Sequence, residues 1–131
     1  MKIGFIGLGK LGLPVALAIE SKGHQVIGTD INDTTLRNIR FKTLNYIEKG
    51  AEELLAKSNL QIKNLDKIVE ESDIIFVPIQ TPHDKKYEGI TRLPEEKADF
   101  NYDYLVKGIK DLNEEIEKQG KDKTVIIIST V

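Results

Sequence analysis

The sequence predicts a doubly wound α/β fold, in which helices cover both faces of a parallel sheet. Short apolar runs alternate along the chain with helix-like stretches, an order typical of parallel strands joined by helical crossovers. The apolar runs are continuous, as in strands that are buried on both faces. In addition, a glycine-rich segment at residues 7–12 lies between the first apolar run and the first helical stretch, where such folds place a tight turn.

The first half of the chain is predicted to form three strands and three helices. In chain order these are a strand at 3–6, a helix at 13–19, a strand at 25–29, a helix at 34–39, a short helix at 51–57 and a weak strand at 60–62. Gly23 is able to take the left-handed conformation that ends the first helix, and Asn32 or Asp33 is available to cap the second.

The second half adds two helices and two strands around an irregular segment. They are a helix around 65–69, a strand at 74–77, a long exposed loop at 81–99, a helix from 101 to 120 and a strand at 124–128. Leu105, Ile109 and Leu112 mark the apolar face of the long helix. Five such strands fit a sheet with the spatial order 3-2-1-4-5.

Because the sequence ends directly after residues 124–128, we expect the sheet to be truncated before its second half is complete. A complete domain would continue with a further helix and strand. Residues 1–131 would then be one incomplete domain of a longer polypeptide, with 124–128 at the open edge of the sheet and its apolar side chains exposed.

The composition excludes several classes of function. The formal net charge is −2, from 19 Lys and Arg against 21 Asp and Glu, so it favours neither nucleic acid nor an anionic membrane as a partner. No apolar stretch approaches the roughly 20 residues of a membrane span, and glycines interrupt the apolar run that a signal peptide needs. With no Cys and two His, the chain lacks a disulfide framework, a cysteine nucleophile and an evident metal site. We therefore expect a cytoplasmic protein.

The glycine-rich segment has the pattern G-x-G-x-x-G, in which each glycine has a physical task. Gly7 permits the tight turn, Gly9 lets the backbone approach a pyrophosphate, and Gly12 lets the helix pack closely on the strand. Free amides at the start of the helix would face the phosphates, assisted by the helix dipole. The pattern predicts a Rossmann-type dinucleotide site formed by Gly7, Leu8, Gly9, Lys10, Leu11 and Gly12. The alternative is a glycine-rich turn that holds no ligand.

Asp30 indicates which dinucleotide the site would hold. It follows the second strand, 18 residues after Gly12, close to the spacing of ~20 that is typical of such sites. A carboxylate there accepts hydrogen bonds from the adenosine ribose diol and repels the 2′-phosphate of NADP. The next basic residue, Arg37, is too distant in sequence to form a phosphate receptor with it, so we expect NAD at Asp30 and the adjoining Ile31. Alternatively, Asp30 is a helix cap or a turn residue.

Two further segments follow strands whose carboxyl ends lie near the point where the strand order reverses, and doubly wound sheets bind ligands there. They are Ile79, Gln80 and Thr81 after strand 74–77, and Ser129 and Thr130 after strand 124–128. Their hydroxyls and amides would face the ribose and nicotinamide of NAD. The formation of turns alone would explain these residues equally well.

Four motifs in a fixed order give the sequence a family resemblance. They are GLGKLGLP at 7–14, Asp30-Ile31-Asn32, Thr81-Pro82 and Ser129-Thr130-Val131. Over its whole length the chain resembles the N-terminal NAD-binding domain of the UDP-glucose/GDP-mannose dehydrogenases, and Leu13-Pro14 is more similar to members that act on UDP-N-acetylhexosamines. The chain departs from the family at Lys10, where an aromatic residue is common, and at Glu48-Lys49-Gly50, where Glu-Pro-Gly is common.

The resemblance implies an oxidoreductase of polysaccharide biosynthesis, similar to UDP-glucose dehydrogenase, that oxidises the primary alcohol of a UDP-sugar to the carboxylate in two NAD-dependent steps. It also implies that Thr130 lies beside the reacting centre and helps to organise a water, and that the backbone at 79–81 touches the cofactor. The family's cysteine nucleophile, its lysine and its sugar-nucleotide domain follow beyond residue 131, so this fragment alone is expected to be inactive. The full-length protein is expected to be a homodimer or a larger oligomer.

Two other functions stay open from the sequence. One is another NAD-dependent alcohol or hydroxyacid dehydrogenase, because several such families begin with G-L-G-x-x-G. The other is a non-catalytic module that senses NAD. Thr81-Pro82 and Ser129-Thr130-Val131 favour the nucleotide-sugar dehydrogenases over both.

Overall fold

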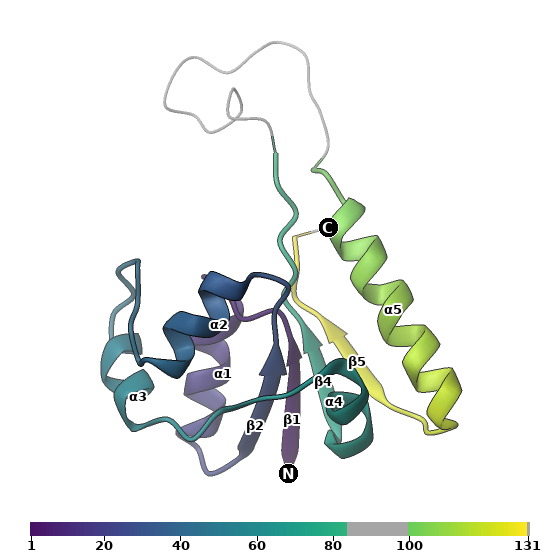
Figure 1. The fold of residues 1–131 in the computed structure, drawn as a ribbon, viewed down its shortest axis with the longest axis horizontal. Helices are drawn as coiled ribbons and strands as arrows, with labels where there is room; N and C mark the ends of the chain where they lie inside the picture. The colour runs from purple at the N-terminus through teal and green to yellow at the C-terminus, as the bar shows by residue number, and fades with distance from the viewer. Residues whose placement is uncertain (84–99, 131) are drawn as a thin grey trace.

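The computed structural model describes residues 1–83 and 100–130 (Figure 1). The predicted loop at 81–99 therefore falls mostly outside the described residues, as does Val131. The elements in chain order are β1 (Lys2–Ile6), α1 (Gly12–Glu20), β2 (Gln25–Thr29), α2 (Asp33–Arg40), α3 (Ala51–Lys57), β3 (Gln61–Ile62), α4 (Leu65–Glu71), β4 (Ile74–Val77), α5 (Asp103–Gln119) and β5 (Thr124–Ile127).

The five strands form one parallel sheet in the order β3-β2-β1-β4-β5, which confirms the predicted topology. β1 is central, and its Gly4 pairs with Ile27 of β2 on one side and with Ile75 of β4 on the other. The strand order reverses between β1 and β4, and in Figure 1 the arrowheads of the strands point to one common edge. Doubly wound sheets bind ligands at this edge, beside the reversal point.

The two faces of the sheet support separate hydrophobic cores. On the face covered by α1 and α3, Phe5 stacks on Phe76 with 5.2 Å between the ring centroids, and Leu17 of α1 is buried with them. On the face covered by α4 and α5, Ile68 and Leu112 are buried against the strands. Figure 1 shows α1, α2 and α3 gathered beside β2, and α4 and α5 beside β4 and β5. The central strands are therefore covered on both sides, as their continuous apolar sequences predict.

Local signals in the sequence set the helix boundaries. Asn32 caps α2, since its Oδ1 accepts hydrogen bonds from the amides of Thr34 and Thr35 at 2.9 and 3.2 Å. α5 ends at Gln119 and is capped by Gly120, whose φ of 63° lies in the left-handed region. The weak third apolar run forms a strand of two residues.

β5 is an edge strand, as expected, and it ends one residue earlier than predicted. Within the described residues it pairs with β4 alone. None of its four residues is buried, and Ile127 is 48% exposed. In the part of the chain that the structure describes, no helix has both the length and the apolar character needed to cross a membrane.

Candidate functional site

The glycine-rich segment forms the turn between β1 and α1. Gly7 has a φ of 122°, a conformation that other residues rarely adopt, so the turn depends on a glycine there. A Cβ on Gly12 would overlap the carbonyl oxygen of Gly7 and the ring of Pro78, so α1 begins in direct contact with the turn and with the end of β4. By contrast, a Cβ on Gly9 would meet no atom within 4 Å. The backbone conformation thus requires a glycine at position 7 and packing requires one at position 12, whereas Gly9 faces open space.

The start of α1 presents a row of unbonded amides. Among residues 1–83 and 100–130, no group accepts a hydrogen bond from the amides of Gly9, Lys10, Leu11 and Gly12. The next amide, that of Leu13, donates to the Gly9 carbonyl oxygen at 3.0 Å. The N-terminal amides of a helix carry the positive end of its dipole, so this row is suited to an anion such as a pyrophosphate.

Asp30 lies beside this turn at the end of β2. Its Oδ2 accepts a hydrogen bond from the Leu8 amide at 2.8 Å, and its Oδ1 accepts one from the Asn32 amide at 2.9 Å. A carboxylate offers about four acceptor positions, so these bonds leave about two for a ligand. Asn32, and not Asp30, caps α2, while the bond to the Asn32 amide makes Asp30 a turn residue as well. The neighbouring Ile31 is 86% exposed.

Hydrogen bonds join the ends of β4 and β5. The Ser129 hydroxyl donates to the Val77 carbonyl oxygen at 3.0 Å, and the Ile128 amide donates to the same oxygen at 3.2 Å. Ser129 is buried, so its hydroxyl group is used to connect the two strand ends and is not available to a ligand as a donor. Thr130, the next residue, is exposed at the carboxyl edge.

The segment after β4 divides its side chains between the core and the surface. A Cβ on Gly108 of α5 would overlap Cδ1 of Ile79, so the Ile79 side chain packs into the core and leaves its backbone for any ligand. Gln80 is exposed and Thr81 is half-buried. Of the predicted site residues, Gly9, Gln80 and Thr130 therefore present accessible groups, whereas Ile79 and Ser129 have side chains committed to the fold.

The residues on the two sides of the segment 84–99 contact each other. The Asn101 amide donates to the Pro82 carbonyl oxygen at 2.7 Å. The rings of His83 and Phe100 meet edge to face with 5.8 Å between centroids. His83 is exposed, and its ring packs against that of Phe100.

Sequence reasoning missed Thr29 and Pro78. The Thr29 carbonyl oxygen accepts a hydrogen bond from the Gly7 amide at 2.9 Å, and Pro78 fills the space beside Gly7 and Gly12. Thr29 acts through its backbone, which leaves no signature in residue type. The sole signal for Pro78 is its position directly after a predicted strand.

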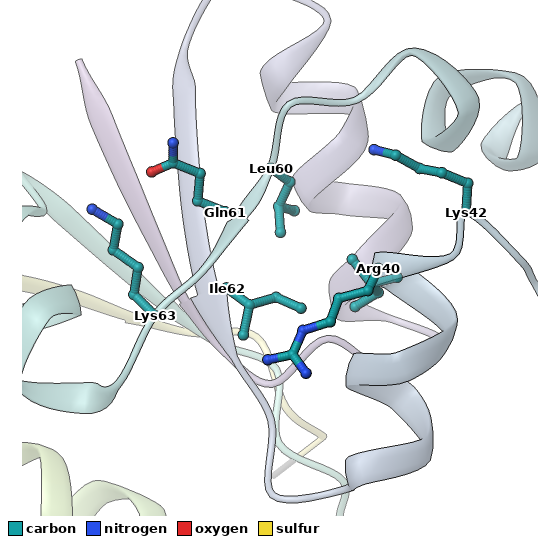
Figure 2. A pocket seen from close by; sticks show the side chains of 7 residues that line it. Arg40, Lys42, Leu60, Gln61, Ile62 and Lys63 are labelled. Carbon is teal, nitrogen blue, oxygen red and sulfur yellow. The ribbon is translucent and has the colours of Figure 1, made fainter.

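A pocket of about 400 Å³ lies elsewhere, between the end of α2 and β3 (Figure 2). Two of its three cations are engaged, because Lys42 donates to the Ser58 carbonyl oxygen at 2.5 Å and Lys63 bonds to both oxygens of Glu71 at 2.9 and 3.0 Å. That leaves Arg40 without a polar partner in the described part of the chain. The pocket shares no residue with the glycine-rich turn. The described residues also hold no group of three or more His, Cys, Asp or Glu placed for a metal ion.

The sequence matches a known protein family over its whole length. The model of the NAD-binding domain of the UDP-glucose/GDP-mannose dehydrogenase family matches residues 1–131. GDP-mannose 6-dehydrogenase of Pseudomonas aeruginosa is 26% identical over 136 residues, covering 100% of this chain and 29% of that protein. UDP-N-acetyl-D-mannosamine dehydrogenase of Methanococcus maripaludis is 32% identical over 103 residues, covering 77% of this chain and 23% of that protein.

Structural comparison agrees with the sequence match. A crystal structure of a ternary complex of GDP-mannose dehydrogenase from Pseudomonas aeruginosa aligns with a TM-score of 0.83 and 27% identity, covering 100% of this chain and 29% of that one. The chain therefore spans less than a third of the length of these relatives.

Proposed function

Because the chain belongs to the UDP-glucose/GDP-mannose dehydrogenase family, we propose that it is the cofactor-binding part of an enzyme that oxidises a nucleotide sugar. One observation carries this proposal: the amides of residues 9–12, which have no acceptor among the described residues, directly follow Leu8, whose amide bonds the Asp30 carboxylate after β2. Amides at a helix N-terminus suit a pyrophosphate, and a carboxylate suits a ribose diol. A dinucleotide needs both.

NAD is the cofactor that this domain family binds. We assign the pyrophosphate to the amides of residues 9–12, the adenosine ribose to Asp30, and the adenine side to the exposed Ile31. Backbone groups of residues 79–81 and the Thr130 hydroxyl are assigned to the nicotinamide side, where Ser129 supports the strand ends. When bound, NAD supplies the hydride acceptor.

The proposed reaction converts the primary alcohol of a UDP-sugar to a carboxylate in two steps. Each step transfers one hydride to one NAD, and the second consumes a water, so the products are the carboxylate, two NADH and three protons. The related proteins named above take their names from GDP-mannose and UDP-N-acetyl-D-mannosamine, both nucleotide sugars. We assign the orientation of the water to the exposed hydroxyl of Thr130.

Residues 1–131 contain no Cys, so a covalent thioester step needs a cysteine from another part of the enzyme. We therefore propose that these residues form the NAD-binding domain of a larger cytoplasmic enzyme, a homodimer or a higher oligomer, and that they are inactive alone. The length of the relatives supports this division, because the chain covers 29% of the P. aeruginosa enzyme.

Calorimetry and a coupled absorbance assay test the proposal. Titration with NADH should reveal one site per chain, and no NADH should form when the chain of 131 residues is given NAD with UDP-glucose, UDP-N-acetylmannosamine or GDP-mannose. Absence of NADH binding would overturn the cofactor assignment. Production of NADH from a nucleotide sugar would overturn the predicted inactivity, and production from a 2-hydroxyacid would favour a different class of dehydrogenase.

A further inference from the structure

The turn that carries the unbonded amides is docked onto the end of β2 at three successive residues. The Gly7 amide donates to the Thr29 carbonyl oxygen at 2.9 Å, and the Leu8 amide donates to Oδ2 of Asp30 at 2.8 Å. The Leu8 side chain is 1% exposed and covers Gly28 so closely that a Cβ there would lie 3.0 Å from its Cδ1. The first part of the turn is thus fixed by side chain and backbone alike.

The three docking residues are Gly28 and Thr29 of β2 and the following Asp30, and Asp30 alone uses its side chain. Gly28 has none, and Thr29 contributes its carbonyl oxygen. In the described part of the chain the Leu8 amide has no acceptor other than Oδ2 of Asp30. Since Oδ1 is held by the Asn32 amide at 2.9 Å, the carboxylate is fixed at both oxygens. The peptide that leads into the row of free amides therefore takes its orientation from Asp30.

We propose that Asp30 is a positioning residue for the phosphate-binding turn, in addition to the ribose contact on which the proposed function rests. Its two bonds set the turn in the ligand-free protein, and its remaining acceptor positions, about two in number, are left for the two hydroxyls of a ribose. One carboxylate thereby couples the pyrophosphate half of the site to the adenosine half. Its removal should weaken ligands that never touch it.

The ligand 2′,3′-dideoxy-ADP separates the two roles, because it keeps two linked phosphates but lacks both ribose hydroxyls. In Asp30→Ala the Leu8 amide loses its acceptor, and we expect calorimetric affinity for this ligand to fall about tenfold, the equivalent of one charge-assisted hydrogen bond. If Asp30 acted through the ribose alone, removal of a negative charge near an anion would leave the affinity unchanged or raise it. That result would overturn the proposal.

Two variants control for charge and for geometry. Asp33→Ala removes the same charge from the exposed first turn of α2, where the side chain makes no bond to the glycine-rich turn, so affinity for 2′,3′-dideoxy-ADP should not fall. Asp30→Asn keeps one acceptor oxygen and should recover part of the affinity that Asp30→Ala loses. An equal loss in Asp33→Ala would show that the loss does not depend on the bond to the Leu8 amide and would contradict the positioning role.

Amide NMR of the ligand-free protein gives a readout that does not depend on binding. In Asp30→Ala the Leu8 amide should shift and exchange faster with solvent, while the amides of β1, which bond within the sheet, should keep their resonances. An unchanged Leu8 resonance overturns the positioning role. If the native chain did not bind NADH, the proposed function would be refuted, but the NMR measurement would still test the positioning role.

Discussion

At the scale of single residues, Gly9 and Gly12 form a matched pair, because the same added methyl group meets different surroundings. In Gly12→Ala the methyl overlaps the turn and Pro78, so we expect the free energy of unfolding to fall by about 1–3 kcal/mol. In Gly9→Ala it meets no atom within 4 Å, so stability should stay within about 0.5 kcal/mol while NADH binding is lost, since the methyl enters the ligand's space. Urea unfolding and calorimetry measure both. Unchanged NADH affinity in Gly9→Ala would contradict the assignment of the pyrophosphate to this turn.

Asp30 also governs the choice between NAD and NADP. In Asp30→Ala, NAD affinity should fall about tenfold or more, because a hydrogen bond to a charged group contributes roughly 1.5–3 kcal/mol. NADP affinity should fall less, since repulsion of its 2′-phosphate disappears with the carboxylate. Calorimetric titration of both cofactors into both proteins gives the ratio. Equal losses would mean that Asp30 acts through the turn and makes no contact with the ribose.

At the scale of elements, Glu71 at the end of α4 connects this helix to β1 and to the residue that follows β3, through two ammonium groups. Its carboxylate pairs with Lys63 at 2.9 Å and with Lys2 of β1 at 3.0 Å. The hydrogen bonds from Lys63 and then from Lys2 hold the pKa of Glu71 below its ordinary value. A carboxyl with a lowered folded pKa stabilises the protein above its unfolded pKa, and this contribution is lost as the pH falls through the folded pKa.

The free energy of unfolding should therefore decline from roughly pH 4.3 downward, and less steeply in Glu71→Gln than in the native chain. Lys63→Met removes the ammonium group that lowers the pKa of Glu71 most and should flatten the profile in the same direction. Urea unfolding at a series of pH values between neutral and acidic provides the slopes. Parallel profiles for the three proteins would show that this network does not couple stability to pH.

The sequence predicts those features that depend on residues close together in the chain, and it does not predict those that depend on contacts between distant residues. The strands themselves and the Asn32 cap follow from local signals, namely continuous apolar runs and a side chain two residues before its donor. The contacts that complete the site are long-range: Pro78 against Gly12, and Ser129 on Val77. A serine has the same chemistry whether it faces a ligand or a strand end, so its residue type cannot distinguish the two.

At the scale of the whole molecule, the two edges of the sheet differ in how well they resist pairing with another chain. β3 is two residues long and is flanked by Lys63, with Arg40 and Lys42 at the neighbouring pocket (Figure 2). Short edge strands and nearby cations oppose the addition of a further strand. β5 has four residues, is apolar after Thr124, and has no strand on its outer side within the described residues. β5 is therefore the edge of the sheet that is more open to pairing with another chain.

We expect the chain of 131 residues to self-associate through β5 as its concentration rises. Open amides and apolar side chains on an edge strand favour pairing with a second copy, and Ile127 is 48% exposed. Ile127→Lys places a charge on that edge and should restore a monomer in sedimentation velocity across a wide concentration range. Ile47→Lys is the matched control, because Ile47 is 100% exposed in the connection between α2 and α3, so the same substitution there should leave the association intact. A native chain that stays monomeric, with the β5 amides protected from hydrogen exchange, would show that this edge is closed in solution by other means.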